Sequence, residues 1–478
     1  MGKATDMFIA AMREKVHLPA YDRRAILGDI RALADYLVKS GLTEDEAVAR
    51  IGGDILGDFY KTPDRNEWYR LDCAARLYPL YATRYKMGVF RVSAYLNENV
   101  VPEALQVALL STLKRFPLYA TTVRRGFFWH YMDATRRHFP IYEEKDMPVQ
   151  PLRLSRKNAV SFRLQYFEKR ISLEIFHILA DGLGAMTFLK SLVREYQRIL
   201  GVDIPLTQTV LDVSQAPRAA EWEDAYLLND QSEIKAPIVD RPALQMNQRR
   251  ARHLPASVIQ FVMPADALVR LARAHNSTVT AVMLAFMFLS ARKCVGKGKR
   301  GRIAFEVPVN LRPFYQTETL RNFALFTLLS ADTEEITDFE GILPLVGTRL
   351  KEGTDKRRLD ALLHSTAAAV VNPLLRYTPL VLKRGVFRIL YKYAGEAGRS
   401  STLSNLGVVK DDFCGTVDKF EIVLGASGVS RTSCGMVACQ NKAVFSMTNA
   451  TRDDAFCDEM LRLLRERGIP VSVSEVRQ

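Results

Sequence analysis

The 478-residue sequence predicts an α/β protein made of two mixed halves that follow a small all-α module. Two observations lead to this prediction. Residues 1–62 show only helical hydrophobic spacing, whereas strand-like alternation and helical spacing occur together on both sides of a polar stretch at 212–255. With 48% hydrophobic and 25% charged residues, the composition is that of a globular protein long enough for two or three domains.

The N-terminal module is expected to hold three helices. A first helical pattern ends at Pro19, and a second runs from about Tyr21 to Ser40. Thr43 and Glu46 form a capping-box pattern for a third helix. This pattern and its Gly-Leu-Thr-x-x-Glu-Ala turn resemble the HAAS-type helical domain of bacterial proteins. The resemblance implies an interaction or regulatory module without chemistry of its own.

The two halves are expected at residues 66–235 and 245–478, joined by a long linker or crossover. In the first half the pattern predicts strands at 88–100, 127–133, 160–167 and 171–177 and helices at 101–117 and 185–200. In the second half it predicts strands at 256–264, 302–310, 417–425 and 443–449 and helices at 265–276, 277–291 and 453–467.

The net charge of +14 indicates an anionic partner, with a solvated basic surface as the plain alternative. Nucleic acid is disfavoured because the basic residues are dispersed and no nucleic-acid-binding motif accompanies them. A phosphorylated cofactor or an anionic membrane face fits the charge equally well. No apolar run is long enough for a transmembrane span, and charged residues interrupt any signal peptide. We therefore expect a cytoplasmic protein and leave peripheral membrane contact open.

The six cysteines are scattered, and no Cys/His cluster has the spacing of a zinc site. We therefore expect reduced, structural thiols and no metal.

One stretch, 171-ISLEIFHILADGLGAMTF-188, carries the candidate chemistry. Alternate apolar residues from Ile171 would share a strand face, and His177 ends that row. Asp181 and Gly182 would form a turn into a helix, because Asp accepts bonds from nearby backbone N–H groups and Gly tolerates positive φ. A neutral imidazole fixed by such a turn can act as a general base, since its ordinary pKa is about 6.5. A lone His on an apolar face is otherwise more often a hydrogen-bonded core residue.

Four motifs, in the same order along the chain, resemble the CoA-dependent acyltransferase superfamily. This superfamily includes chloramphenicol acetyltransferase, the plant BAHD acyltransferases and peptide condensation domains. The motifs are 68-WYRLDCAARLYP-79, 177-HILADG-182 for the family's HxxxDG, 308-PVNLRP-313 with the following Arg321-Asn322-Phe323, and 404-SNLG-407. The closest likeness is to bacterial alcohol acetyltransferase-like proteins, and it covers nearly everything after the N-terminal module.

The resemblance implies two chloramphenicol-acetyltransferase-like subdomains that form a pseudo-dimer around a central tunnel, with acyl-CoA and the acceptor entering from opposite sides. It also implies His177 as general base and Asp181 as a structural residue, with Gly182 completing the motif. Arg312 is the partner we assign to Asp181. Asn405 is a candidate contact for the tetrahedral oxyanion, with a turn residue as the alternative. No metal is implied.

Two departures from the family narrow the prediction. Phe176 stands where condensation domains commonly carry the first His of HHxxxDG, and the BAHD element DFGWG is absent between residues 401 and 450. We therefore expect an acyltransferase that moves an acetyl or other short acyl group from CoA to a small alcohol or amine. The alternatives are a condensation-type enzyme with an acyl carrier protein as donor and a catalytically silent member of the fold that binds a ligand or partner.

Overall fold

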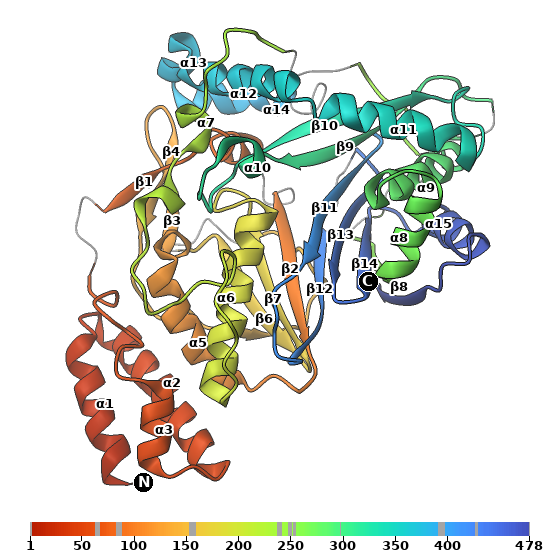
Figure 1. Ribbon diagram of the computed structural model, residues 1–478. Helices are drawn as coiled ribbons and strands as arrows, with labels where there is room; N and C mark the ends of the chain where they lie inside the picture. The colour runs from red at the N-terminus through yellow and green to blue at the C-terminus, as the bar shows by residue number, and fades with distance from the viewer. Residues whose placement is uncertain are drawn as a thin grey trace.

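The computed structural model describes residues 2–62, 67–82, 88–152, 159–236, 241–246, 251, 255–296, 298–390, 397–425 and 429–477. The strands of this part of the chain form a five-stranded, a seven-stranded and a three-stranded sheet, with helices packed on the two larger ones (Figure 1). The mixed α/β class predicted from the sequence is confirmed.

The N-terminal module consists of three helices, as predicted: α1 (Lys3–Lys15), α2 (Ala20–Lys39) and α3 (Glu44–Ile51). The capping box is present, because the Glu46 N–H donates to Thr43 Oγ1 and the Thr43 N–H donates to Glu46 Oε2. Helix α2 packs on α5 (Pro102–Arg115), and α3 packs on α6 (Gly182–Leu200). The apolar core of the module is therefore continuous with that of the first half.

The five-stranded sheet has the order β12-β2-β7-β6-β5, with antiparallel pairing except between β5 and β6. Its strands are β12 (Val417–Leu424), β2 (Val89–Leu96), β7 (Arg170–Phe176), β6 (Phe162–Phe167) and β5 (Tyr142–Glu143). Because β12 comes from near the C-terminus and pairs with β2, this sheet draws strands from both ends of the chain. A strand of the predicted second half thus extends the sheet of the predicted first half.

The two faces of this sheet differ in chemistry. Alternate residues of β2 and β7 such as Val92 and Leu173 are fully buried in an apolar core that includes α5 and α6. The other face carries Arg91, which is 2% exposed and forms ion pairs with Glu174 and Glu144, so its charge is compensated. On that face the second half approaches, since Gln260 Nε2 lies 3.4 Å from Tyr95 Oη.

The seven-stranded sheet has the order β10-β9-β11-β13-β14-β8-β15. Its strands are β10 (Ala324–Asp332), β9 (Arg302–Asn310), β11 (Ser401–Val409), β13 (Thr432–Cys439), β14 (Lys442–Asn449), β8 (Ser257–Pro264) and β15 (Ser472–Arg477). Strand β11 runs parallel to both of its neighbours, and the other pairs are antiparallel. A second apolar core lies between this sheet and α8 (Ala265–Ala274), α9 (Val279–Cys294), α11 (Phe339–Gly353) and α15 (Ala455–Glu466).

A three-stranded sheet of β1 (Trp68–Arg70), β4 (His130–Ala134) and β3 (Thr121–Arg125) completes the described structure. The remaining helices are α4 (Tyr78–Tyr81), η1 (Pro117–Tyr119), η2 (Ala219–Trp222), α7 (Ala225–Leu228), α10 (Arg312–Tyr315), α12 (Lys356–Val371), α13 (Pro373–Tyr377) and α14 (Leu380–Leu390). The stretch predicted as linker contains η2 and α7, and its residues 237–240, 247–250 and 252–254 lie outside the described part.

Among the described helices, none alone is both long and apolar enough to span a membrane. The pair α8–α9 reaches that length and composition, but it bends by 85° between its two helices.

Candidate active site

His177 follows the last residue of β7, at the end of the row of alternate residues that begins at Ile171. Its backbone N–H donates to the Gly88 oxygen at 2.8 Å, which holds the strand end against the start of β2. The ring stacks on Tyr78 with centroids 4.6 Å apart and also contacts Phe90. Unlike the buried Phe176 before it, His177 is partly exposed. The residue is thus placed to meet a small molecule.

The hydrogen bonds around His177 define which ring nitrogen carries the proton. His177 Nδ1 lies 2.9 Å from Asn322 Oδ1, and Asn322 Nδ2 donates to Asp72 Oδ2 at 3.1 Å. Because the Asn322 amide presents its oxygen to the ring, Nδ1 is the donor and Nε2 keeps its lone pair. Burial lowers the pKa of His177, and the bond to Asn322 opposes this only in part. Among the described residues none bonds to Nε2, so the arrangement provides a neutral imidazole with one basic nitrogen available.

Asp72 anchors this chain of side chains. It is fully buried, its Oδ1 accepts from the Ala75 N–H at 2.7 Å, and Arg321 Nε lies 3.4 Å from its Oδ2. Burial raises the pKa of Asp72, while the Arg321 charge and these donors act in the opposite direction. Asp72 and Asn322 belong to the motifs WYRLDC and Arg321-Asn322-Phe323, but these motifs alone predict no role for either residue. No local pattern relates the two, since they are 250 residues apart.

Asp181 holds the turn after His177 and joins the two halves. Its Oδ1 accepts from the Gly184 N–H at 3.0 Å and so caps α6, and its Oδ2 accepts from the Phe323 N–H at 2.9 Å. Arg312 donates to both oxygens, at 2.8 and 3.1 Å. Burial raises the pKa of Asp181, but Arg312 and the backbone donors more than offset this and hold it below its usual value. The structure therefore brings Asp181 and Arg312 into one buried, bidentate ion pair.

Glycine occupies two positions of the turn for a reason that differs from the predicted one. Gly182 begins α6, and neither it nor Gly184 has positive φ, so the expectation based on conformational freedom was wrong. Instead, both lie where the second half comes close. A Cβ on Gly182 would lie 2.6 Å from Leu406 Cδ2, and a Cβ on Gly184 would overlap the backbone oxygen of Leu320. The small residues allow the two halves to meet beside His177.

This contact predicts different costs for two similar substitutions. Gly184→Ala is expected to lower the free energy of unfolding by about 1–3 kcal/mol, because the backbone oxygen of Leu320 cannot move aside alone. Gly182→Ala is expected to cost less, since the Leu406 side chain can change rotamer. Chemical denaturation of both variants measures the difference. Equal loss in the two would show that the halves do not meet as closely as the structure has them.

Asn405 lies in β11, at an irregularity in its pairing with β13. Its Oδ1 accepts from the Gly407 N–H at 2.9 Å, and its Nδ2 donates to Thr280 Oγ1 at 2.9 Å. Gly407 adopts positive φ there, as a bulge requires. The bond to Thr280 uses one of the two N–H donors of the Asn405 amide, so contact with an oxyanion would use the other.

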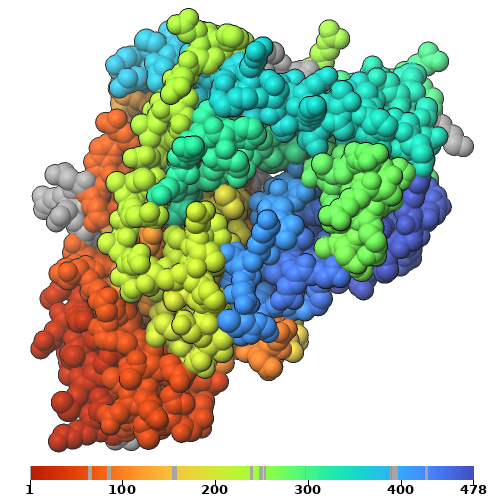
Figure 2. Space-filling view, viewed as in Figure 1, coloured from red at the N-terminus to blue at the C-terminus, as the bar shows by residue number. Residues whose placement is uncertain are grey.

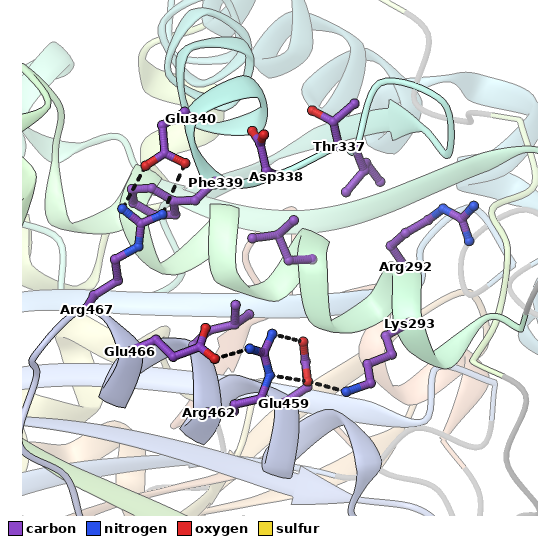
Figure 3. Close-up of a pocket in the computed structure, with 13 residues that line it drawn as sticks. Arg292, Lys293, Thr337, Asp338, Phe339, Glu340, Glu459, Arg462, Glu466 and Arg467 are labelled. Atoms are coloured by element: carbon purple, nitrogen blue, oxygen red, sulfur yellow. Dashed lines mark hydrogen bonds and ion pairs between the residues drawn. The ribbon is translucent and has the colours of Figure 1, made fainter.

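A surface pocket of about 500 Å³ lies elsewhere, between α9, α11 and α15 (Figure 3). Its charged side chains neutralise one another: Arg462 and Lys293 pair with Glu459, and Arg467 pairs with Glu340. No histidine is among its lining residues. Among the described residues no group of three or more His, Cys, Asp or Glu side chains could hold a metal ion. The pocket offers no counterpart to the free base at His177.

Comparison with solved structures gives the fold. The first condensation domain of the calcium-dependent antibiotic synthetase matches with a TM-score of 0.58 and 13% identity over 84% of this chain and 96% of that one. TRI101 of F. sporotrichioides, complexed with coenzyme A and T-2, matches with a TM-score of 0.56 and 13% identity over 84% and 99%. TRI3 trichothecene 15-O-acetyltransferase of Fusarium sporotrichioides matches with a TM-score of 0.51 and 13% identity over 85% and 96%.

No family model and no curated protein matches the sequence. The chain therefore shares the fold of these three proteins, in agreement with the resemblance carried by its sequence motifs.

Proposed function

We propose that the protein is an acyltransferase that moves an acyl group from a CoA thioester to a hydroxyl or amine, with His177 as the general base. The observation that carries the proposal is the free Nε2 of a neutral ring whose tautomer is fixed through Asn322 and Asp72. The residues that surround the ring come from both halves, as a site built for two substrates requires.

The proposed step moves one proton and exchanges two bonds. His177 Nε2 takes the proton of the acceptor O–H or N–H while the oxygen or nitrogen attacks the thioester carbonyl carbon. The tetrahedral intermediate collapses, its C–S bond breaks, and the proton passes from Nε2 to the departing sulfur. Asp181 takes no part in proton transfer, because Arg312 and two backbone N–H groups occupy its oxygens. Its proposed role is to hold the turn.

Coenzyme A is the donor that we propose. Neighbours of the same fold were crystallised with coenzyme A or ethyl coenzyme A, and a net charge of +14 suits an anionic nucleotide. An acyl carrier protein carries the same thioester arm and is also acidic, and one structural neighbour is a condensation domain. Phe176 in place of a first histidine favours the free CoA thioester over the condensation-type reaction.

The experiment that tests the proposal is thiol release from a panel of acyl-CoAs of increasing chain length, offered with mixed alcohols and amines. We expect release that depends on the acceptor and an acylated product of matching mass. A carrier protein loaded with the same acyl groups is the second donor. Binding of acyl-CoA without release from either donor would instead support a catalytically silent member of the fold.

Asn322 is proposed as a positioning residue, and its substitution separates positioning from folding. Asn322→Ala is expected to lower kcat/KM by roughly 10²-fold, because the ring loses the partner that aims Nε2. The bond to Asn322 raises the pKa of His177, so its loss should move the acid limb of the pH–rate profile to lower pH. An unchanged pH profile with lower activity would indicate a purely structural role.

A further inference from the structure

Helix α14 has its apolar face turned away from the protein. The exposed side chains are Val381, Leu382, Val386 and Ile389, at 82%, 61%, 56% and 63%. Lys383, on the other face, is 2% exposed; its Nζ donates to the Phe128 and Arg376 oxygens and lies 3.6 Å from the Trp129 ring centroid. A surface helix of a globular protein normally has the opposite arrangement.

The turn between β3 and β4 extends this apolar surface. The Leu380 N–H donates to the Phe127 oxygen at 2.9 Å, and the Phe128 and Tyr377 rings meet edge to face at 5.8 Å. Phe127 is 73% exposed and Leu374 85%. We call these exposed side chains the apolar patch: Phe127, Leu374, Tyr377, Val381, Leu382, Val386 and Ile389. Contiguous exposed surface of this kind marks an interaction site.

The apolar patch lies at the end of the molecule opposite the N-terminal helices. Figure 1 shows α12–α14 at the top of the view and α1–α3 at the bottom, and the same blue-cyan region lies at the upper left of the space-filling view (Figure 2). A partner there would not meet the N-terminal module.

The charges around the apolar patch indicate the kind of partner. Residues 116–132 and 361–390 contain no Asp or Glu; of their basic residues, Arg124 pairs with Asp133 and Lys383 is buried. Arg125 and Arg376 are exposed. Apolar side chains that enter the acyl boundary, beside cations and without carboxylates, are what an anionic lipid surface binds.

We propose that the apolar patch docks the protein peripherally on an anionic lipid bilayer. Helix α14 packs on α4, and Tyr78 of α4 stacks on His177, so docking would bring the candidate base within one helix of the membrane surface. Resting on the proposed function, this placement makes the acceptor an amphiphilic alcohol or amine dissolved in the bilayer.

Co-sedimentation of the full chain with vesicles tests the docking. We expect binding to phosphatidylcholine vesicles that contain phosphatidylglycerol, and little binding to phosphatidylcholine alone. The double variant Leu374→Glu/Val381→Glu should bind at least about tenfold more weakly, with an unchanged melting temperature because both side chains are exposed. The matched control is Tyr21→Glu, at an 81% exposed position on the N-terminal module, which should bind as the wild type does.

Two further variants test the role of the basic residues in docking and the independence of docking from acyl transfer. Arg125→Glu/Arg376→Glu should remove the preference for phosphatidylglycerol. His177→Ala should bind vesicles normally, so docking can hold even if acyl transfer fails. The membrane proposal is overturned if wild-type protein ignores both vesicles or if the Leu374→Glu/Val381→Glu variant binds equally well. Self-association that this variant abolishes, in a protein that ignores vesicles, would make the apolar patch a protein interface instead.

Discussion

His177→Ala is expected to lower acyl transfer by about 10²–10⁴-fold, because the variant lacks the ring nitrogen that takes the acceptor's proton in the proposed reaction. Asn322 and Asp72 fix the tautomer that leaves Nε2 free. The initial rate of thiol release with the best donor and acceptor measures the loss. Binding of acyl-CoA should change little, since the imidazole acts on the acceptor.

A second histidine provides the matched control. His364 is also partly buried, and its Nδ1 lies 2.8 Å from Asp230 Oδ1, but it belongs to α12 and lies outside the HxxxDG motif. His364→Ala should therefore keep its rate, while both variants keep a cooperative thermal transition. Transfer at the wild-type rate in His177→Ala would overturn the proposed role of this residue.

Local patterns predicted the elements whose sequence signals are themselves local. The Thr43–Glu46 capping box begins α3, Thr278 caps α9, and the alternation around Ile171 forms β7. Other elements lacked such a signal. Helix α11 contains Pro344 in its interior, and the SNLG segment has the residues of a turn although it is a bulged strand. Neighbouring strands decide the conformation of such a segment, and the segment alone does not specify them.

The residues of the candidate site also differ in whether a local sequence pattern reveals them. His177 and Asp181 belong to one short motif, so they were found together. Asp72 and Asn322 come from other parts of the chain, and only the assembled fold shows that they support the ring. The pairing of Arg312 with Asp181 was assigned from a family resemblance, because no spacing in the sequence relates two residues 131 apart. Long-range partners require the tertiary structure.

Asp181→Ala is expected to lower the free energy of unfolding by about 3–5 kcal/mol and to reduce transfer as well. Arg312 Nη1 loses Asp181 Oδ2 as an acceptor and keeps only Asn310 Oδ1 of the two at this turn. The Gly184 and Phe323 N–H groups lose their partner as well. The free energy therefore includes the cost of an uncompensated, largely buried charge. Denaturant titration of Asp181→Ala, Arg312→Met and the double variant measures it.

The double variant distinguishes an ion pair from two independent contacts. Once either partner is gone, loss of the other should cost much less. The double variant should therefore lose less free energy of unfolding than the two single variants lose together. The matched control is Asp266→Ala, which breaks an exposed pair with Arg270 on α8 and should cost no more than about 0.5 kcal/mol. Additive effects at Asp181 and Arg312 would contradict their coupling.

The pH dependence of this stability has a definite sign. Arg312 and the backbone donors hold the pKa of Asp181 below its usual value, so the native state favours the carboxylate. Its contribution is fully present above the unfolded pKa of about 3.9 and is lost as the pH falls through the lower native pKa. The stability gap between wild type and Asp181→Ala should therefore be constant near neutral pH and narrow below about pH 4. Other carboxylates titrate in both proteins and cancel in the difference, so a gap that stays constant into acid would mean that the Asp181 carboxylate is not the source of the stability.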